Sequence, residues 1–361
     1  MPLRPRPEVE QLRVCPHGGP NYAEAGAAGL TPGKIMDLSV SSNPFMPPPG
    51  IKRTISRAII GQYPDSEAIE FRRSLAGTLG IAPDNIIAGS GTIELIRLIA
   101  LAYFRPGDGV LLLEPTFGEY EVAIQLAGAK TIKYRSSEAN GFAPQTEEVI
   151  RLIKQRRPRA VFLCNPNNPT GHYLSRTNIE AISQAIGDDG MLILDEAYVT
   201  FVESTWDSTK LITRNVIILR SMTKDYGLAG LRLGYAIAGR DIIANLRKVC
   251  PPWNVNAVAL EIGTAALHYT DYLEQTNRKI IAAREYLIAR LTALGLTPLP
   301  SDANFFLVRV GNARKFRAAL LKKGMMVRDC TSFGLPEYIR IAPRTLPECR
   351  KLINAIMEIR E

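Results

Sequence analysis

Short apolar runs alternate with amphipathic helical patterns along most of the chain. The runs are typical of buried strands and comprise Val110–Leu113, Ala160–Cys164, Met191–Leu194, Val216–Leu219 and Tyr235–Ala238. Between them, apolar residues recur at helical spacing in Glu94–Phe104, in Glu119–Leu126 and, after Ser175 as the expected N-cap, in Ile179–Ile186. Short strands separated by helices predict a mostly parallel sheet that is covered by helices on both faces.

The pattern differs at the two ends of the chain. The first 49 residues are rich in Pro and Gly, which predicts an arm rather than a long helix. After Pro252, residues 257–294 favour long helices, and short strands are expected within Asn304–Val310, Met325–Arg328 and Tyr338–Ile341. We therefore predict an α/β protein with three parts: residues 1–49 as an arm joining the small domain, 50–253 as the large domain, and 254–361 as an interdomain helix and a small α+β domain.

Composition narrows the class of protein. The net charge is +9, but Lys and Arg are scattered and no aromatic-rich basic segment accompanies them, which disfavours nucleic-acid binding and favours anionic substrates. The five cysteines form no CxxC pair, so neither a disulfide framework nor a metal site is expected. No segment has the length of a membrane span or the apolar core of a signal peptide, so we expect a soluble, cytoplasmic protein.

Lys224 and Asp195 are the strongest candidates for catalysis. Asp195 directly follows an apolar run, at the carboxyl end of a predicted central strand, where open α/β sheets bind their ligands. A buried charge at such a position is either functional or paired. An amine that forms a Schiff base and an acid that holds a pyridinium nitrogen are the protein groups that pyridoxal 5′-phosphate (PLP) chemistry requires. The pair therefore predicts a PLP enzyme.

Further residues suit the phosphate of such a cofactor. Ser90, Gly91 and Thr92 open a predicted helix, whose free N–H groups attract a phosphate. Ser221 and Thr223 offer hydroxyls beside Lys224, and Arg232, between Gly230 and Gly234, offers a guanidinium that matches a phosphate. The alternatives are that Ser90–Thr92 form a plain turn before a helix, that Ser221 and Thr223 lie in a polar loop, and that Arg232 is a surface residue. The recurrence of these residues around Lys224 argues against all three, and the glycines and leucines that flank Arg232 argue against a surface position.

Three residues are candidates for contact with the cofactor ring. Tyr198 and Asn168 can reach its phenolic oxygen, and Phe117 can stack on its face, although a core Phe is an equally simple interpretation.

As a set, these motifs resemble the class I/II aminotransferases, which are PLP enzymes of fold type I. The resemblance rests on Asn165–Gly171, Asp195–Tyr198, Ser221–Lys224 and Gly230–Gly234, which occur in the family's order and spacing. It implies a large domain with a mostly parallel, seven-stranded type of sheet between helices, and a small α+β domain. It also implies a homodimer in which Tyr63 reaches the partner's cofactor phosphate, and an Arg340 that binds the substrate carboxylate.

Within the family, the chain is similar to two groups that act on phosphorylated amino compounds. Arg328 resembles an arginine that binds the substrate phosphate in both histidinol-phosphate aminotransferases and the threonine-phosphate decarboxylases of cobalamin biosynthesis. His17 and Gly18, followed by Asn43, are similar to the opening of the decarboxylases. We therefore expect first a decarboxylase of L-threonine O-3-phosphate, with histidinol-phosphate or related transamination as the alternative. The motif after Lys224 has the aminotransferase form, and the substrate stays open between the two.

A non-enzymatic alternative is the ligand-sensing domain of a transcription regulator that borrows this fold. Such regulators carry a DNA-binding domain ahead of it, and residues 1–50 are too short and too rich in Pro for a helix-turn-helix module. The sequence therefore favours an enzyme.

Overall fold

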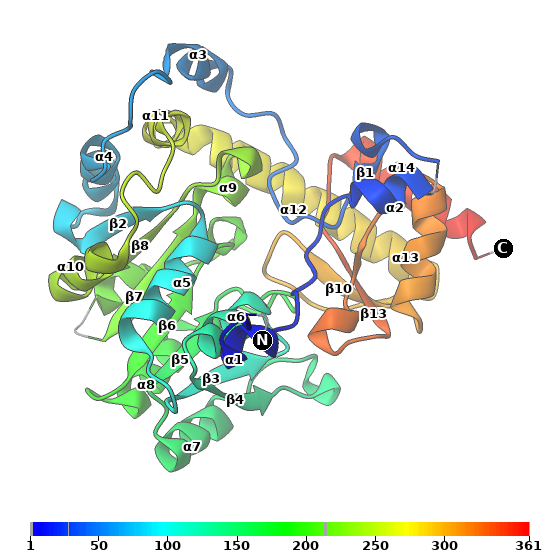
Figure 1. The fold of residues 1–361 in the computed structure, drawn as a ribbon. Helices are drawn as coiled ribbons and strands as arrows, with labels where there is room; N and C mark the ends of the chain where they lie inside the picture. The colour runs from blue at the N-terminus through cyan, green and yellow to red at the C-terminus, as the bar shows by residue number, and fades with distance from the viewer. Residues whose placement is uncertain (1–2, 28, 213–214, 361) are drawn as a thin grey trace.

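The computed structural model describes residues 3–27, 29–212 and 215–360. A seven-stranded sheet forms one lobe of the protein, and a smaller sheet with its own helices forms the other (Figure 1). The large sheet has the order β2-β8-β7-β6-β5-β3-β4. Its strands are β2 (Ile86–Gly89), β3 (Gly109–Glu114), β4 (Lys130–Arg135), β5 (Ala160–Cys164), β6 (Met191–Asp195), β7 (Val216–Ser221) and β8 (Gly234–Ala238). Strand β8 runs antiparallel to both of its neighbours, and the other pairings are parallel.

The alternating side chains of the strands build two hydrophobic cores, one on each face of the sheet. In β6, Leu192 and Leu194 face one core and Ile193 faces the other, because successive side chains of a strand point to opposite faces. The first core is completed by α4 (Ile69–Leu79), α7 (Thr146–Arg156), α8 (Arg176–Ile186) and α11 (Ala257–Ala266). The second is completed by α5 (Thr92–Tyr103), α6 (Glu119–Leu126) and α10 (Arg240–Val249). The prediction of a sheet covered on both faces is confirmed.

The five strands expected for this sheet are all present, and two further strands were missed. Strand β4 lies at the sheet edge and carries Lys130, Lys133 and Arg135, the charged residues that protect edges from further pairing but hide the apolar signal. Strand β2, the opposite edge, is only four residues long and ends in Gly89. Edge strands are therefore the part of the sheet that the apolar pattern does not reveal.

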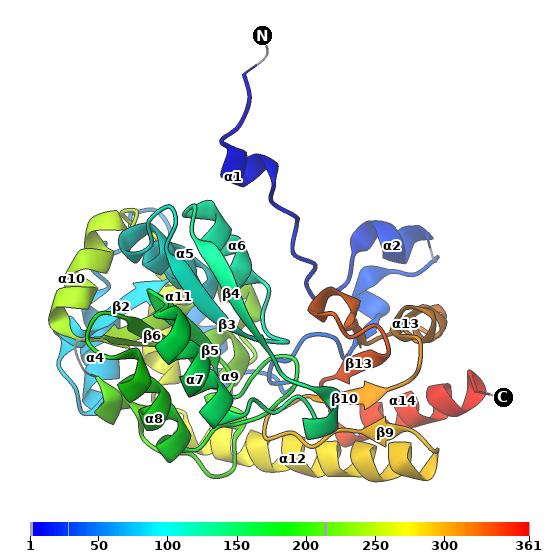
Figure 2. The ribbon, with the colours of Figure 1, turned by 90° about the horizontal axis from the view of Figure 1, so that it is seen from below.

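The second lobe contains a four-stranded antiparallel sheet of order β12-β13-β10-β9. Its elements are β9 (Thr297–Pro298), β10 (Phe306–Arg309), β12 (Arg328–Asp329), β13 (Tyr338–Ile341), α13 (Ala313–Lys322) and α14 (Leu346–Glu358). Phe306, Val308, Ile339 and Ile341 face a core shared with Leu287 and other residues of α12. The long helix α12 (Thr270–Ala293) runs along both lobes, as Figure 2 shows in yellow.

The arm crosses from the first lobe to the second. It carries the short helices α1 (Pro7–Glu10) and α2 (Tyr22–Ala27) and the strand β1 (Met36–Asp37). Helix α3 (Pro49–Arg57) follows the arm. In the large lobe, the short helix α9 (Met222–Asp225) follows β7 and carries Lys224. Strand β1 pairs in parallel with β11 (Met325–Met326), which attaches the arm to the smaller lobe. The segment 325–328, where short strands were expected, holds β11 and the start of β12, and these join different sheets on either side of the buried Val327. The division of the chain at residues 49 and 253 into separate folding units stays a prediction.

A buried ion pair joins the carboxyl ends of β6 and β7. Arg220 Nε lies 2.9 Å from Glu196 Oε2, and the Glu196 side chain has no exposed surface. Ser208 Oγ donates to the same carboxylate oxygen at 2.7 Å. Asp195 and Ser221 are the direct neighbours of these two residues, so the ion pair fixes the strand ends that carry them.

We expect Arg220→Met to lower the free energy of unfolding by about 3–5 kcal/mol, because it leaves Glu196 buried without its cation. Arg278→Met is the matched control, since the Arg278–Glu274 pair is largely exposed and exposed pairs contribute less than about 1 kcal/mol. Urea unfolding of both variants at one protein concentration measures the difference. Equal midpoints for the two variants would show that the buried pair is not structurally important.

Candidate active site

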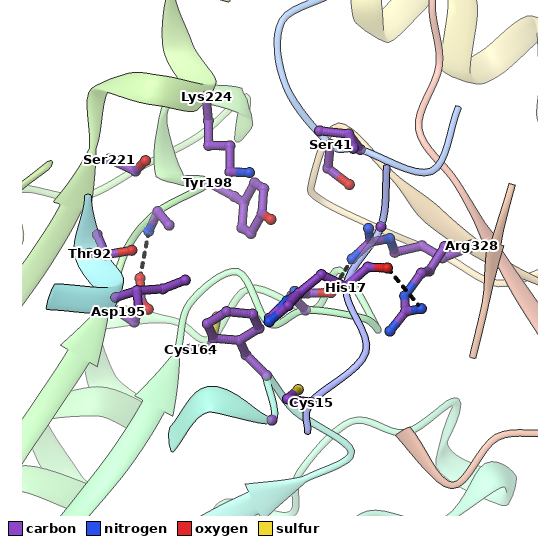
Figure 3. Close-up of a pocket in the computed structure, with 18 of the residues that line it drawn as sticks. Cys15, His17, Ser41, Thr92, Cys164, Asp195, Tyr198, Ser221, Lys224 and Arg328 are labelled. Carbon is purple, nitrogen blue, oxygen red and sulfur yellow. Dashed lines mark hydrogen bonds between the residues drawn. The ribbon is translucent and has the colours of Figure 1, made fainter. Parts of the chain in front are cut away.

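A cavity lies between the two lobes at the carboxyl ends of the central strands. It encloses about 1050 Å³, including its open mouth, and both lobes and the arm contribute to its wall. Lys224 and Asp195 enter it from the large sheet, whereas Arg328 enters from the opposite side and His17 of the arm lies between them (Figure 3). The topology thus brings together residues that are far apart in the sequence.

Lys224 presents a buried amine to this cavity. Its Nζ lies 5.8 Å from the centre of the Tyr198 ring. Burial, together with the positive charges of Arg340 and Arg232, lowers the pKa of Lys224 to about 8. A lysine with a lowered pKa is more often uncharged near neutral pH, and an uncharged amine can attack a carbonyl carbon or accept a proton.

Asp195 is held at the end of β6 by two hydrogen bonds. Its Oδ2 accepts from the Tyr120 hydroxyl at 2.8 Å, and its Oδ1 accepts from the backbone N–H of Ala197 at 3.0 Å. Burial raises the pKa of this carboxyl to about 6, against the effect of both hydrogen bonds. A buried carboxylate in this state gains from a cationic partner, which is what a protonated pyridine nitrogen provides.

A cluster of donors at the start of α5 is suited to a phosphate. The helix has Gly91 as its N-cap, with no capping side chain, so its first N–H groups are free to bind an anion. Ser221 and Thr223 are buried with their hydroxyls 2.7 Å apart. A Cβ atom at Gly91 would lie 2.8 Å from Nη2 of Arg232, so a larger residue there would require the guanidinium to shift, and the φ of 76° at this position also favours glycine.

Arg340 is a buried cation with an unused donor. Its Nη1 donates to Asn168 Oδ1 and its Nη2 donates to the backbone oxygen of Ser39 at 2.7 Å. Its Nε is buried and has no hydrogen-bond partner among the described residues. The guanidinium also lies 5.0 Å from the centre of the Phe305 ring. A buried, partly unsatisfied guanidinium is suited to binding an anionic group of a ligand.

Arg328 lies nearer the mouth, where the arm occupies its donors. Nη2 donates to the backbone oxygen of Pro16 at 2.6 Å and to Ser332 Oγ at 2.8 Å, and Nη1 approaches the backbone oxygen of His17 at 3.4 Å. Burial and the charge of Arg340 lower the pKa of Arg328. The two arginines therefore create one positively charged wall of the cavity.

Most of the residues predicted from the sequence line this cavity. Those that do so are His17, Gly18, Thr92, Phe117, Asn168, Asp195, Tyr198, Ser221, Thr223, Lys224, Arg232, Arg328 and Arg340. Ser90 and Gly91 support it from the loop before α5, where the N–H of Ser90 donates to Glu94 Oε2 at 2.6 Å. The role of each residue stays a prediction at this point.

Asn43 and Tyr63 lie elsewhere. The Asn43 amide donates to the backbone oxygen of Asp225 and to Thr276 Oγ1, and its Oδ1 accepts from Phe45, so its groups are used within the protein. This arrangement gives no support to a substrate contact by Asn43. Tyr63 is 78% exposed and stacks on Trp253, with ring centres 4.4 Å apart.

Sequence reasoning missed several residues of the wall. Tyr120, the partner of Asp195, belongs to an amphipathic helix, and its position alone suggests a core residue. Ser39, Ser41, Ser332 and Phe333 lie in short connections without a recognisable motif. Cys15 was treated only as part of a cysteine count, although it lies two residues before His17.

The residues present fit PLP. Lys224 supplies a buried amine, Asp195 a buried carboxylate, and the start of α5 with Ser221, Thr223 and Arg232 supplies phosphate donors in the same cavity. Tyr198 packs edge-on against Phe305, which holds its ring at the cavity wall.

Comparison with known proteins agrees with this chemistry. The family described as Aminotransferase class I and II matches residues 33–356. A histidinol-phosphate aminotransferase of Moorella thermoacetica is 33% identical over 333 residues, covering 90% of this chain and 85% of that protein. A histidinol-phosphate aminotransferase 1 of Thiobacillus denitrificans is 32% identical and covers 98% of this chain and 92% of its own.

Solved structures show the same fold. Histidinol-phosphate aminotransferase from Sinorhizobium meliloti, in complex with pyridoxal-5′-phosphate, has a TM-score of 0.88 at 24% identity, covering 99% of this chain and 98% of its own. L-threonine-O-3-phosphate decarboxylase from Porphyromonas gingivalis has a TM-score of 0.80 at 27% identity, covering 90% and 99%. No helix within the described ranges is both long and apolar enough to span a membrane.

The family match over residues 33–356 and the relatives of more than 30% identity show that the chain belongs to the class I and II aminotransferases and is a PLP-dependent enzyme.

Proposed function

We propose that this enzyme transfers the amino group of a phosphorylated amino compound, with histidinol phosphate as the first candidate. The observation that carries the proposal is the shared cavity, in which the Lys224 amine and the Asp195 carboxylate face a wall with two arginines. The two relatives found by sequence, at 32% and 33% identity, are histidinol-phosphate aminotransferases, which favours transamination over the decarboxylation that the arm sequence first suggested.

The two arginines explain how one cavity can accept both substrates of a transamination. A phosphorylated amine carries a dianionic phosphate, whereas a dicarboxylic oxo acid carries two separate carboxylates. Guanidinium groups bind phosphate and carboxylate oxygens with similar geometry. Arg340, which is buried, and Arg328, which is near the mouth, therefore provide two anion positions at different depths.

The residues around Lys224 divide the remaining work. PLP, when bound, supplies an electron sink for the bonds at the substrate α-carbon. Asp195, held by Tyr120 at the end of β6, supplies a negative charge for the ring nitrogen. Lys224 is placed to take up and return a proton because its pKa is lowered. Arg340 and Arg328 orient the substrate and thereby decide which bond breaks. Tyr198 and Asn168 are proposed to contact the ring oxygen, and Phe117 its face.

Decarboxylation of L-threonine O-3-phosphate is the second candidate. His17 and Gly18, whose sequence is similar to the opening of such decarboxylases, lie in the cavity wall beside Arg328. The Porphyromonas gingivalis decarboxylase also shares the fold. The same residues suit either reaction, because the orientation of the α-carbon determines the outcome.

Transamination and decarboxylation differ in the co-substrate that they need: transamination consumes an oxo acid, whereas decarboxylation does not. We expect purified enzyme with histidinol phosphate to turn over only when an oxo acid such as 2-oxoglutarate is present, and to form the corresponding amino acid. With phosphothreonine and no oxo acid, we expect no release of CO₂. Both can be followed in one set of reactions, by amino-acid analysis and by a coupled CO₂ assay. Release of CO₂ from phosphothreonine alone would replace transamination with decarboxylation.

The lowered pKa of Lys224 gives a second test. Only the uncharged amine joins the cofactor aldehyde, so the rate of covalent attachment to cofactor-free protein should rise as pH increases through about 8. Arg340→Gln removes a positive charge that lowers this pKa, so the midpoint of the rate profile should move to higher pH. Stopped-flow absorbance measures the rate, and Arg278→Gln controls for loss of an exposed cation. An unmoved midpoint in Arg340→Gln contradicts the electrostatic argument, and attachment in Lys224→Ala would identify another lysine as the anchor.

We further propose that the enzyme is a homodimer in which Tyr63 contacts the partner's cofactor phosphate. The segment that holds Tyr63 exposes several apolar side chains, namely Ile55, Ile59, Ile60 and Ile69, and the exposed Trp253 stacks on Tyr63. Clusters of exposed apolar residues are typical of protein interfaces. Tyr63 lies outside the wall of the cavity in its own chain, which leaves its hydroxyl free to act in another.

Variants of this surface separate assembly from cofactor binding. Ile60→Asp should yield monomers in sedimentation equilibrium, whereas Met357→Asp on α14 should not change the mass. Tyr63→Phe should stay dimeric and weaken cofactor binding about tenfold, the effect of losing one hydrogen bond to a charged group. Mixed dimers of Tyr63→Phe and Lys224→Ala should regain one normal site. Dimers of Tyr63→Phe that bind the cofactor normally would remove Tyr63 from the site.

A further inference from the structure

Three metal-ligating side chains meet at the mouth of the cavity, apart from the cofactor residues. Sγ of Cys15, a ring nitrogen of His17 and a carboxylate oxygen of Glu119 all lie within 4.8 Å of one another. His17 Nε2 is 3.0 Å from Glu119 Oε1. Two ligands come from the arm and one from the first residue of α6, so the cluster connects the arm to the large lobe.

The surroundings hold these side chains in place. A Cβ atom at Gly118 would lie 2.6 Å from the Cys15 sulfur, so the thiol fits against the chain there only because residue 118 is glycine. Arg97 Nη2 donates to Glu119 Oε2 at 2.6 Å, which fixes the carboxylate and leaves Oε1 directed to His17. On the other side, Arg328 binds the backbone oxygens of Pro16 and His17.

We propose that Cys15, His17 and Glu119 form a binding site for a thiophilic divalent cation of the zinc class. A thiolate, an imidazole and a carboxylate are the ligand types that zinc takes in proteins, and three protein ligands leave a fourth position for water or a ligand. Alkaline-earth cations are poorly matched, since they prefer oxygen ligands alone. Binding replaces the His17–Glu119 hydrogen bond by two metal bonds. The proton on His17 Nε2 leaves that nitrogen, so that the other ring nitrogen carries the N–H of the neutral imidazole, and the Cys15 thiol releases its proton to solvent.

An ion bound at this position would affect access to the active-site cavity. Cys15, His17 and the adjoining Gly118 line the same cavity as Lys224. An ion bound there would fasten the arm to α6 across the mouth, while Arg328 holds the arm to the smaller lobe. The enzyme would then be closed to its substrates in a metal-dependent way.

Cobalt(II) titration of the PLP-loaded enzyme tests the site directly. Cobalt bound by a thiolate in a tetrahedral site absorbs at longer wavelengths than the cofactor does, so the two signals are separable. We expect this absorption in the wild type, its loss in Cys15→Ser, and affinity at least about tenfold weaker in His17→Ala. Zinc added afterwards should displace cobalt and abolish the absorption.

Two variants serve as controls. Cys250→Ser removes another partly buried thiol, remote from the cluster, and should titrate like the wild type. Glu119→Gln can still hydrogen-bond with His17 but is a poorer metal ligand, so it should bind cobalt more weakly while retaining the arm contact. Equal cobalt absorption in Cys15→Ser and the wild type, loss of the signal in Cys250→Ser, or no thiolate signal at all would overturn the proposal.

Discussion

The active site depends on two buried groups of opposite charge, the Lys224 amine and the Asp195 carboxylate, which lie in the cavity wall at and just beyond the carboxyl ends of the adjacent strands β6 and β7. Burial works against both charges: it lowers the pKa of Lys224 to about 8 and raises that of Asp195 to about 6. Each group is therefore close to losing its charge near neutral pH. PLP suits both groups, because its aldehyde reacts with the uncharged amine and its protonated ring nitrogen stabilises the charged carboxylate.

The fold has to hold these groups against the cost of burying them. Strands β6 and β7 are adjacent and parallel, so their carboxyl ends place Asp195 and the segment leading to Lys224 side by side. The Glu196–Arg220 pair joins the same two strand ends, and Tyr120 supports the carboxylate from α6. These contacts hold the two strand ends to each other and to α6, which fixes the position of Asp195.

The sequence was sufficient for the parts of this arrangement whose signal is local. The buried strands have continuous apolar runs, and Asp195 and Lys224 follow two of them, so the fold class and the core of the site could be predicted. Tyr120 could not, because an aromatic residue on an amphipathic helix has the same pattern whether it fills a core or binds a carboxylate. Asn43 is the opposite case: its motif suggested a substrate contact, which stays a prediction, and its amide connects the arm to α12 through Thr276.

The position of the arm is the feature that a linear pattern describes least, because the contacts that attach it to both lobes join residues distant in sequence. Arg328 lies 312 positions from Pro16, yet it donates to the Pro16 carbonyl at 2.6 Å. A phosphate or carboxylate oxygen carries a full charge and is a stronger acceptor for a guanidinium than a neutral carbonyl is. A substrate anion that reaches Arg328 therefore competes with the arm for the same donors. The charge of the substrate and the position of the arm are thereby coupled through Arg328. Arg340, deeper in the cavity, also holds the arm through Ser39, but its unpaired Nε can bind an anion while that bond stays in place.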